Sequence, residues 1–198
     1  MATTSAHSHI STSTHSKTPA TNTARKAIKP LRIFLVGMMG SGKSFWADKL
    51  KRKFKVPAYD LDALIEMMEE KSVAEIFSED GEDYFRKAEA KMLRLFGEKK
   101  QFILACGGGT ATYHDNIEWM NKQGITIWLD EPVEVLSQRL VNTQSRRPLL
   151  KNISNENIPG FLNTKLEERQ PYFSKAKYRL SGEQLAENTF AKLIKENA

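Results

Sequence analysis

The chain has 198 residues, a length typical of one domain that can bury a full core and still hold a cleft. Its formal net charge is +6, but four of these charges come from residues 1–30, which hold four basic side chains and no acidic ones. Residues 31–198 are therefore nearly balanced in charge, and we expect no basic nucleic-acid-binding stripe on them. No apolar run approaches the roughly 20 residues that cross a bilayer. The single cysteine, Cys106, excludes an internal disulfide and fits a reducing compartment. We therefore expect no membrane and no nucleic-acid partner, and a cytoplasmic location.

The first segment, residues 1–28, is rich in Ser, Thr, Ala and His and has almost no large apolar side chain. Such a composition predicts a disordered tail, because it cannot bury enough surface to offset the entropy of ordering. It is also basic and acid-free, as organelle transit peptides are, so a plastid-targeted precursor is the alternative to a cytoplasmic protein. We expect one domain over residues 29–198.

The first predicted strand, residues 31–36, runs into a glycine-rich loop and then into a helix at 45–50. The loop fits G-x-x-x-x-G-K-[ST], in which backbone N–H groups and a lysine cradle the phosphates of a nucleotide and the final hydroxyl ligates Mg²⁺. The predicted ATP-binding residues are Gly37, Met38, Met39, Gly40, Ser41, Gly42, Lys43 and Ser44.

The second predicted strand, residues 56–60, ends in Asp60-Leu61-Asp62. Two carboxylates at that spacing can divide their roles, one holding Mg²⁺ directly or through water and the other meeting a substrate hydroxyl, although either could instead cap the next helix. The candidate metal ligands are Ser44 and Asp60. Helical patterns follow from 62 to about 100, with breaks near Ser72 and Gly81. Arg86 and Glu89 stand three residues apart on the last of these helices and can pair on one face.

The third predicted strand, residues 102–106, ends in three glycines, Gly107, Gly108 and Gly109, which allow a ligand to approach the backbone closely. The pattern predicts seven further segments in this order: a helix at 114–122, a strand at 125–129, a helix from 132, a polar and basic stretch at 142–157, a helix ending near 172, a weak strand at 178–180 and a final helix. Strands that alternate with helices predict a parallel α/β sheet covered on both faces. Ligands bind at the carboxyl ends of such strands, where the glycine loop, the two aspartates and the three glycines fall.

In their order and spacing these motifs resemble the shikimate kinase family, from residue 31 to about 180. The resemblance rests on the glycine loop, Asp60-Leu61-Asp62, Gly81 with Phe85-Arg86 and Glu89, Gly107-Gly108-Gly109, Arg147-Pro148-Leu149-Leu150 and Arg169-Gln170-Pro171-Tyr172. It implies a three-layer α/β/α P-loop kinase fold with a five-stranded parallel sheet in the order 2-3-1-4-5. It also implies a substrate-binding segment at about 61–91, a lid at about 142–157, and a monomer.

The activity implied by the resemblance is the phosphorylation of the 3-hydroxyl of shikimate by ATP and Mg²⁺, which gives shikimate 3-phosphate and ADP on the way to chorismate and the aromatic amino acids. By the same resemblance, Asp62 orients or deprotonates the attacking hydroxyl. Arg86 and Arg169 clamp the shikimate carboxylate, with Glu89 positioning Arg86. Gly108 and Gly109 contact the substrate through the backbone, and Arg147 is the lid arginine over the transferred phosphoryl group.

Two positions depart from the family pattern. Phe45 stands where the family usually has Thr, so we expect altered packing there and retained metal binding by Ser44. Leu140 stands where members often have an arginine that stacks on adenine, and Arg139 is its neighbour.

Other protein classes share parts of this pattern. A nucleotide switch that reads guanine would have Asn-Lys-x-Asp after a late strand, and residues 121–124 lack the aspartate. The Asp-Glu pair and the signature-like loop of a transport ATPase occur here in the wrong order. Another small-molecule or nucleotide monophosphate kinase would share the loop and the basic lid, but the two aspartates, the three glycines and the two arginines favour a polyhydroxylated carboxylate.

Overall fold

A computed structural model describes residues 31–141, 150 and 153–197, together with Met1. Its centre is a five-stranded sheet in the order β2-β3-β1-β4-β5, with every neighbouring pair parallel. The strands are β1 (Leu31–Val36), β2 (Ala58–Asp60), β3 (Gln101–Ala105), β4 (Ile125–Asp130) and β5 (Tyr178–Ser181). The predicted fold and strand order are therefore confirmed, although β2 begins two residues later than the apolar pattern suggested.

The helices fall where the sequence predicts them. They are α1 (Lys43–Phe54), α2 (Leu61–Glu69), α3 (Val73–Glu79), α4 (Glu82–Leu95), α5 (Asn116–Gln123), α6 (Val133–Val141), α7 (Ile158–Phe173) and α8 (Glu187–Asn197). Their starts have local causes. Asp60 caps α2 by accepting from two backbone N–H groups, and Ser72 and Glu75 form a reciprocal capping box at α3. At the start of α4, Gly81 has φ 86°, a conformation that favours glycine.

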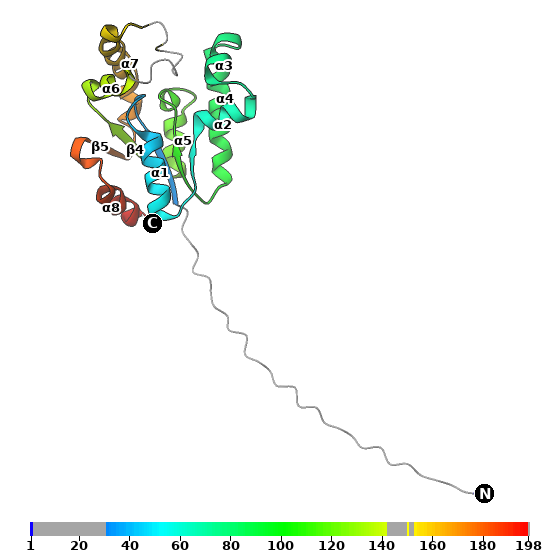
Figure 1. The fold of residues 1–198 in the computed structure, drawn as a ribbon. Coiled ribbons are helices and arrows are strands. Elements are labelled where there is room, and N and C mark those ends of the chain that lie inside the picture. Colours follow the sequence, from blue (N-terminus) through cyan, green and yellow to red (C-terminus); the bar gives the residue numbers. More distant parts are fainter. Residues whose placement is uncertain (2–30, 142–149, 151–152, 198) are drawn as a thin grey trace.

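Alternate residues of β1 face the two sides of the sheet and divide the core in two. Phe34 and Val36 lie in one apolar cluster with residues of α4, α5 and α7, whereas Ile33 and Leu35 lie in another with residues of α1 and α8. Both faces of a parallel sheet are thus covered. Figure 1 shows α2, α3 and α4 together beyond one edge of the sheet, and β5 with α6 and α7 at the other.

The register of the strands aligns their carboxyl ends. Asp60 pairs with Ala105 across β2 and β3, and Leu35 pairs with the same Ala105 from β1. The segments that follow these three strands, 37–42, 61–62 and 106–109, therefore start at one edge of the sheet, as the sequence predicted.

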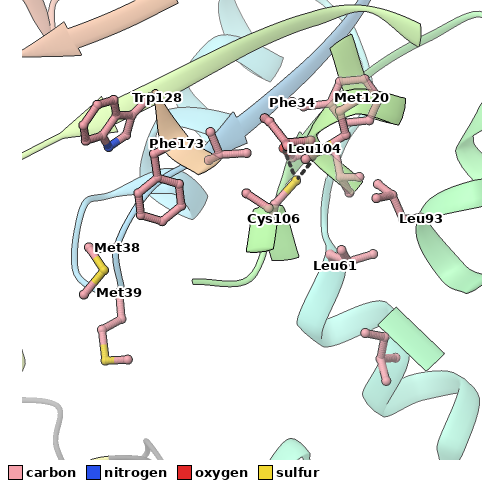
Figure 2. Packing of buried hydrophobic residues seen from close by; sticks show 14 of the residues in the cluster. Phe34, Met38, Met39, Leu61, Leu93, Leu104, Cys106, Met120, Trp128 and Phe173 are labelled. Carbon is pink, nitrogen blue, oxygen red and sulfur yellow. Dashed lines mark hydrogen bonds between the residues drawn. The ribbon is translucent and has the colours of Figure 1, made fainter. Parts of the chain in front are cut away.

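Cys106, the first residue after β3, is fully enclosed in the apolar core. Its Sγ lies 3.7 Å from Met120 Sδ, and Figure 2 shows the side chain pointing into the cluster beside Leu104. Burial raises the pKa of this thiol well above its usual range. Cys106 is therefore a packing residue of the core. None of the helices in the described part of the chain is long and apolar enough to cross a membrane.

Candidate active site

The glycine loop between β1 and α1 is shaped by backbone geometry that side chains would prevent. Gly37 has φ 139°, and a Cβ on it would lie 2.5 Å from the carbonyl oxygen of Leu129. The side chains of Met38 and Met39 are buried and anchor the loop to the core, on the side where Figure 2 shows Trp128 and Phe173. The apolar side chains therefore hold the loop against the core, while Gly40 and Gly42 stay partly exposed.

Lys43, the first residue of α1, folds back over this loop. Its Nζ donates to the carbonyl oxygens of Gly37 at 2.9 Å and Met38 at 2.8 Å. These bonds fix a positive charge at the N-terminus of α1, where the helix dipole also favours an anion. This arrangement can receive a chain of phosphates, as the motif predicts.

Ser44 and Asp60 lie in contact at the next position. The Ser44 hydroxyl donates to Asp60 Oδ2 at 2.5 Å, while the other carboxylate oxygen of Asp60 caps α2. Mg²⁺ in phosphoryl-transfer sites takes one or two protein oxygens and completes its shell with phosphates and water. A hydroxyl and a carboxylate side by side at the mouth of a phosphate loop fit that requirement. No cluster of three or more His, Cys, Asp or Glu side chains that could hold a metal ion occurs among the described residues.

Asp62, in the first turn of α2, carries the most perturbed carboxylate of the cleft. Its Oδ1 is buried and has no hydrogen-bond partner among the described residues. Burial, followed by the negative charges of Glu89 and Asp60, raises its pKa from 3.8 to about 7, against the opposing effect of Lys43 and Arg86. A buried carboxylate with a free oxygen and a pKa near neutrality is suited to accept a proton.

Arg86 is held from two sides on α4. Its Nε and Nη2 donate to Glu82 Oε1 at 3.1 and 2.9 Å, and its Nη1 donates to Glu89 Oε2 at 2.9 Å. Arg86 is 4% exposed and Glu89 is fully buried, so the predicted pairing of these two residues is present and is not a surface ion pair. The aromatic ring of Tyr113 lies 4.6 Å from the guanidinium carbon and adds a cation–π contact.

Arg169 lies on α7, far from Arg86 in the sequence, and its side chain reaches the same part of the site. It is 5% exposed, and its Nη1 donates to the carbonyl oxygen of Gly108 at 3.1 Å. Burial and then the positive charge of Arg86 lower its pKa. The two guanidinium groups lie beside consecutive residues, Arg169 at Gly108 and Arg86 at Gly109. In the described residues no carboxylate forms an ion pair with Arg169, so an anionic ligand would relieve the repulsion between the two arginines.

The three glycines after β3 leave room for the site's own side chains. A Cβ on Gly107 would lie 2.7 Å from both Asp62 Oδ1 and Glu89 Oε1, and a Cβ on Gly109 would lie 2.7 Å from Arg86 Nη2. A Cβ on Gly108 would lie 3.4 Å from Arg169 Nη1 and from the backbone nitrogen of Met39. The sequence predicted close approach by a ligand, and the structure adds close approach by the residues expected to bind it.

A cleft of about 580 Å³ joins the phosphate loop to the two aspartates. The predicted site residues that line it are Met39, Gly40, Gly42, Lys43, Ser44, Asp60, Asp62 and Gly108. Arg86, Gly109 and Arg169 are not among the described residues that line this cleft, but Arg169 is joined to its lining by the hydrogen bond to the Gly108 carbonyl oxygen. The structure thus brings together the predicted residues that it describes, whereas Arg147 and most of the expected lid fall on residues 142–149 and 151–152, outside the described part.

A second hollow of about 680 Å³ adjoins the first and shares Gly42, Phe45 and Arg139 with it. Phe45 is 60% exposed at this junction, while its neighbour Trp46 is buried against Phe190. Leu140 is fully buried beneath Gly40, and Arg139 donates to the Gly40 carbonyl oxygen at 3.0 Å and pairs with Glu131. Residue 45 is therefore an exposed ring next to a buried one.

Two partners of the arginine cluster were missed by the sequence reasoning. Glu82 bonds Arg86 four residues along α4, a spacing that could have indicated it. Thr110 donates its hydroxyl to Glu89 Oε1 from a separate segment, and no local pattern marks that contact.

Comparison with known proteins agrees with this geometry. The family model described as shikimate kinase matches residues 39–197. A shikimate kinase from Phocaeicola vulgatus is 40% identical over 154 residues, which cover 78% of this chain and 88% of that protein. The crystal structure of a shikimate kinase from Bacteroides thetaiotaomicron matches with a TM-score of 0.75 at 34% identity and covers 84% of this chain and 95% of that one.

A shikimate kinase from Acinetobacter baumannii, solved in complex with shikimate, has a TM-score of 0.72 at 30% identity, over 84% of this chain and 89% of that one. The family model spans most of the chain, and the relatives match over most of their own length. The chain therefore belongs to the shikimate kinase family.

Proposed function

We propose that the cleft between the phosphate loop and the two buried arginines carries out the family's reaction with Asp62 as the proton acceptor. As a member of the family, the protein is an ATP-dependent kinase that phosphorylates shikimate. The observation that carries the assignment of roles is the position of Asp62. Asp62 lines a cleft together with residues of the phosphate loop, and its Oδ1 is buried and has no hydrogen-bond partner in the described structure.

ATP is proposed to place its terminal phosphates against the N–H groups of residues 37–42 and the Lys43 ammonium. Ser44 and Asp60 would hold Mg²⁺, which neutralises charge on the phosphates when bound. Arg147 is proposed to add positive charge from the lid. Phosphoryl transfer depends mainly on such positioning and charge neutralisation, because the protein takes little part in the covalent chemistry.

Shikimate is proposed to place its carboxylate between Arg86 and Arg169, with Gly108 and Gly109 against it. This support comes from two adjacent buried cations, one of which has no ion-pair partner in the described structure. Guanidinium groups bind planar carboxylates through paired N–H groups and fix the direction of the ligand. The ring would then extend toward Asp62 and the phosphate loop.

In the transfer step, Asp62 accepts the proton of the 3-hydroxyl while the hydroxyl oxygen attacks the γ-phosphorus of ATP. The bond from that phosphorus to the bridging oxygen breaks, and ADP leaves with the electron pair. A base is most effective when its pKa lies near the working pH, since it is then both ionised and basic. The raised pKa of Asp62 meets this condition.

The test compares Asp62→Asn with the wild type in turnover and in shikimate binding. Loss of a general base costs about 10²- to 10⁴-fold in kcat, whereas shikimate binding measured by calorimetry should change far less because the arginines remain. An Asp62→Asn variant that is folded and turns over at the wild-type rate would remove Asp62 from the chemistry.

A further inference from the structure

Thr110 begins the short helical turn Thr110–Thr112 directly after the third glycine, and it is fully buried. Its backbone N–H donates to the Gly107 carbonyl oxygen at 3.2 Å, and its own carbonyl oxygen accepts from Asn116 Nδ2 at 2.9 Å. Asn116 is in turn bonded by Arg94 at 2.9 Å. Thr110 is therefore held in place by hydrogen bonds to the loop after β3 and to Asn116 at the start of α5, which Arg94 joins to α4.

From this fixed point the Thr110 hydroxyl donates to Glu89 Oε1 at 2.5 Å. The other oxygen, Glu89 Oε2, accepts from Arg86 Nη1 at 2.9 Å. Each oxygen of this fully buried carboxylate thus has one donor, and the two donors come from different segments. A buried carboxylate that lost one of them would leave an unsatisfied charged oxygen, which costs more than the average hydrogen bond contributes.

Because Thr110 and Arg86 each bond a different oxygen of Glu89, this arrangement also determines which N–H groups of Arg86 remain available to a ligand. Glu82 already occupies the edge formed by Nε and Nη2. While Thr110 holds Glu89 Oε1, Glu89 bonds the guanidinium with one oxygen only. If Oε1 were released, it could turn to Arg86 and complete a two-pronged pair, which is the preferred geometry of arginine with a carboxylate. That pair would take up the N–H groups that a bound anion needs.

We infer that Thr110 is a positioning residue for shikimate binding, and that its hydroxyl keeps Glu89 from occupying the part of Arg86 that receives the substrate carboxylate. The inference rests on the proposed role of Arg86 as a carboxylate ligand. It assigns to Thr110 an effect on one substrate only, because the phosphate loop shares no hydrogen bond with Thr110, Glu89 or Arg86 in the described structure.

The experiment compares Thr110→Val, which replaces the hydroxyl with a methyl group of similar size, with Thr110→Ser, which keeps the hydroxyl. Thr112→Val is the matched control, since Thr112 lies on the same turn and its buried hydroxyl has no hydrogen-bond partner in the described structure. We expect Thr110→Val to raise KM for shikimate about tenfold, equivalent to about 1.4 kcal/mol, and to leave KM for ATP within about twofold of wild type. Thr110→Ser and Thr112→Val should both keep the wild-type KM for shikimate.

Calorimetry with shikimate and with its methyl ester, which lacks the negative charge, separates this inference from the proposed function. We expect the wild type to bind shikimate much more tightly than the ester, and Thr110→Val to weaken shikimate binding but not ester binding. Equal wild-type affinity for the two ligands would remove the arginine clamp and this inference with it. A preserved preference for shikimate together with a wild-type KM in Thr110→Val would overturn the inference alone.

The inference would also be overturned if KM rose for both shikimate and ATP in Thr110→Val and rose equally in Thr110→Ser. That pattern would indicate a general loosening of the site. If Thr110→Val does not fold, Thr110→Ala removes the same hydroxyl without adding a branched apolar group. It must then show the same selective rise.

Discussion

Replacing Asp62 by Asn should stabilise the fold while it lowers kcat by about 10²- to 10⁴-fold, and the gain in stability should depend on pH. Burial raises the pKa of Asp62 from 3.8 to about 7, so between these values the folded protein holds a proton that the unfolded chain releases. The stability associated with the protonated, neutral group is present at low pH and is lost as pH rises through about 7. Asparagine has a similar shape and cannot ionise, so the variant does not undergo this loss.

The size of the effect follows from the pKa difference. The two pKa values lie about three units apart, and each unit corresponds to 1.36 kcal/mol, so the variant should gain up to about 4 kcal/mol over the wild type at pH 8. At pH 4 the gain should be close to zero, because the carboxyl group is then largely protonated in the folded state and half-protonated in the unfolded chain. The difference between the two proteins should grow through the interval from about pH 4 to pH 7.

Urea denaturation of both proteins at pH 5 and pH 8 measures this difference directly. Asp48→Asn is the matched control, because Asp48 is an exposed carboxylate on α1 and its loss changes the net charge in the same way. The reasoning is refuted if the stability of Asp62→Asn relative to wild type is the same at both pH values, or if Asp48→Asn reproduces the whole effect.

Three further changes test other parts of the site. Arg169→Ala should raise KM for shikimate by about thirtyfold or more and leave KM for ATP nearly intact. The rise corresponds to the loss of roughly 2 kcal/mol expected when a buried charged partner is truncated. An unchanged KM for shikimate would exclude Arg169 from the site. Gly109→Ala places a Cβ 2.7 Å from Arg86 Nη2. Steady-state kinetics should show a raised KM for shikimate, and thermal unfolding should show a loss of about 1–3 kcal/mol in the free energy of unfolding. Wild-type values of both would mean that Arg86 has another position. Ser44→Ala removes the hydroxyl that bonds Asp60, and the Mg²⁺ concentration for half-maximal activity should rise about tenfold; an unaltered Mg²⁺ dependence would leave Ser44 outside the metal shell.

Much of the fold could be predicted because local patterns decide it. The apolar run of β1 indicates a strand buried on both faces, and the glycine loop after it requires a strand before and a helix behind. The breaks near Ser72 and Gly81 mark the starts of α3 and α4 correctly, because a capping box and a left-handed glycine are local features.

The site was predicted less completely, because its contacts join distant segments. Arg86 and Glu89 were recognisable as a pair three residues apart, but the buried hydroxyl of Thr110 reaches Glu89 across 21 positions of sequence. The place of Phe45 between two hollows also depends on distant residues such as Val135 and Arg139 of α6, which line one of these hollows and which no pattern at residue 45 encodes. The tail at 1–28, the lid at 142–157, the monomeric state and the cytoplasmic location stay predictions.

The most direct test of the central claim is ADP release from ATP and Mg²⁺ in the presence of single acceptors. Shikimate would be compared with quinate, gluconate, CMP and UMP at equal concentrations, and the phosphorylated position of the product would be determined by NMR. The account predicts strong stimulation by shikimate alone and a product phosphorylated at the 3-hydroxyl. Stimulation by a nucleoside monophosphate or gluconate without stimulation by shikimate would contradict it, because the acceptor would then not be shikimate.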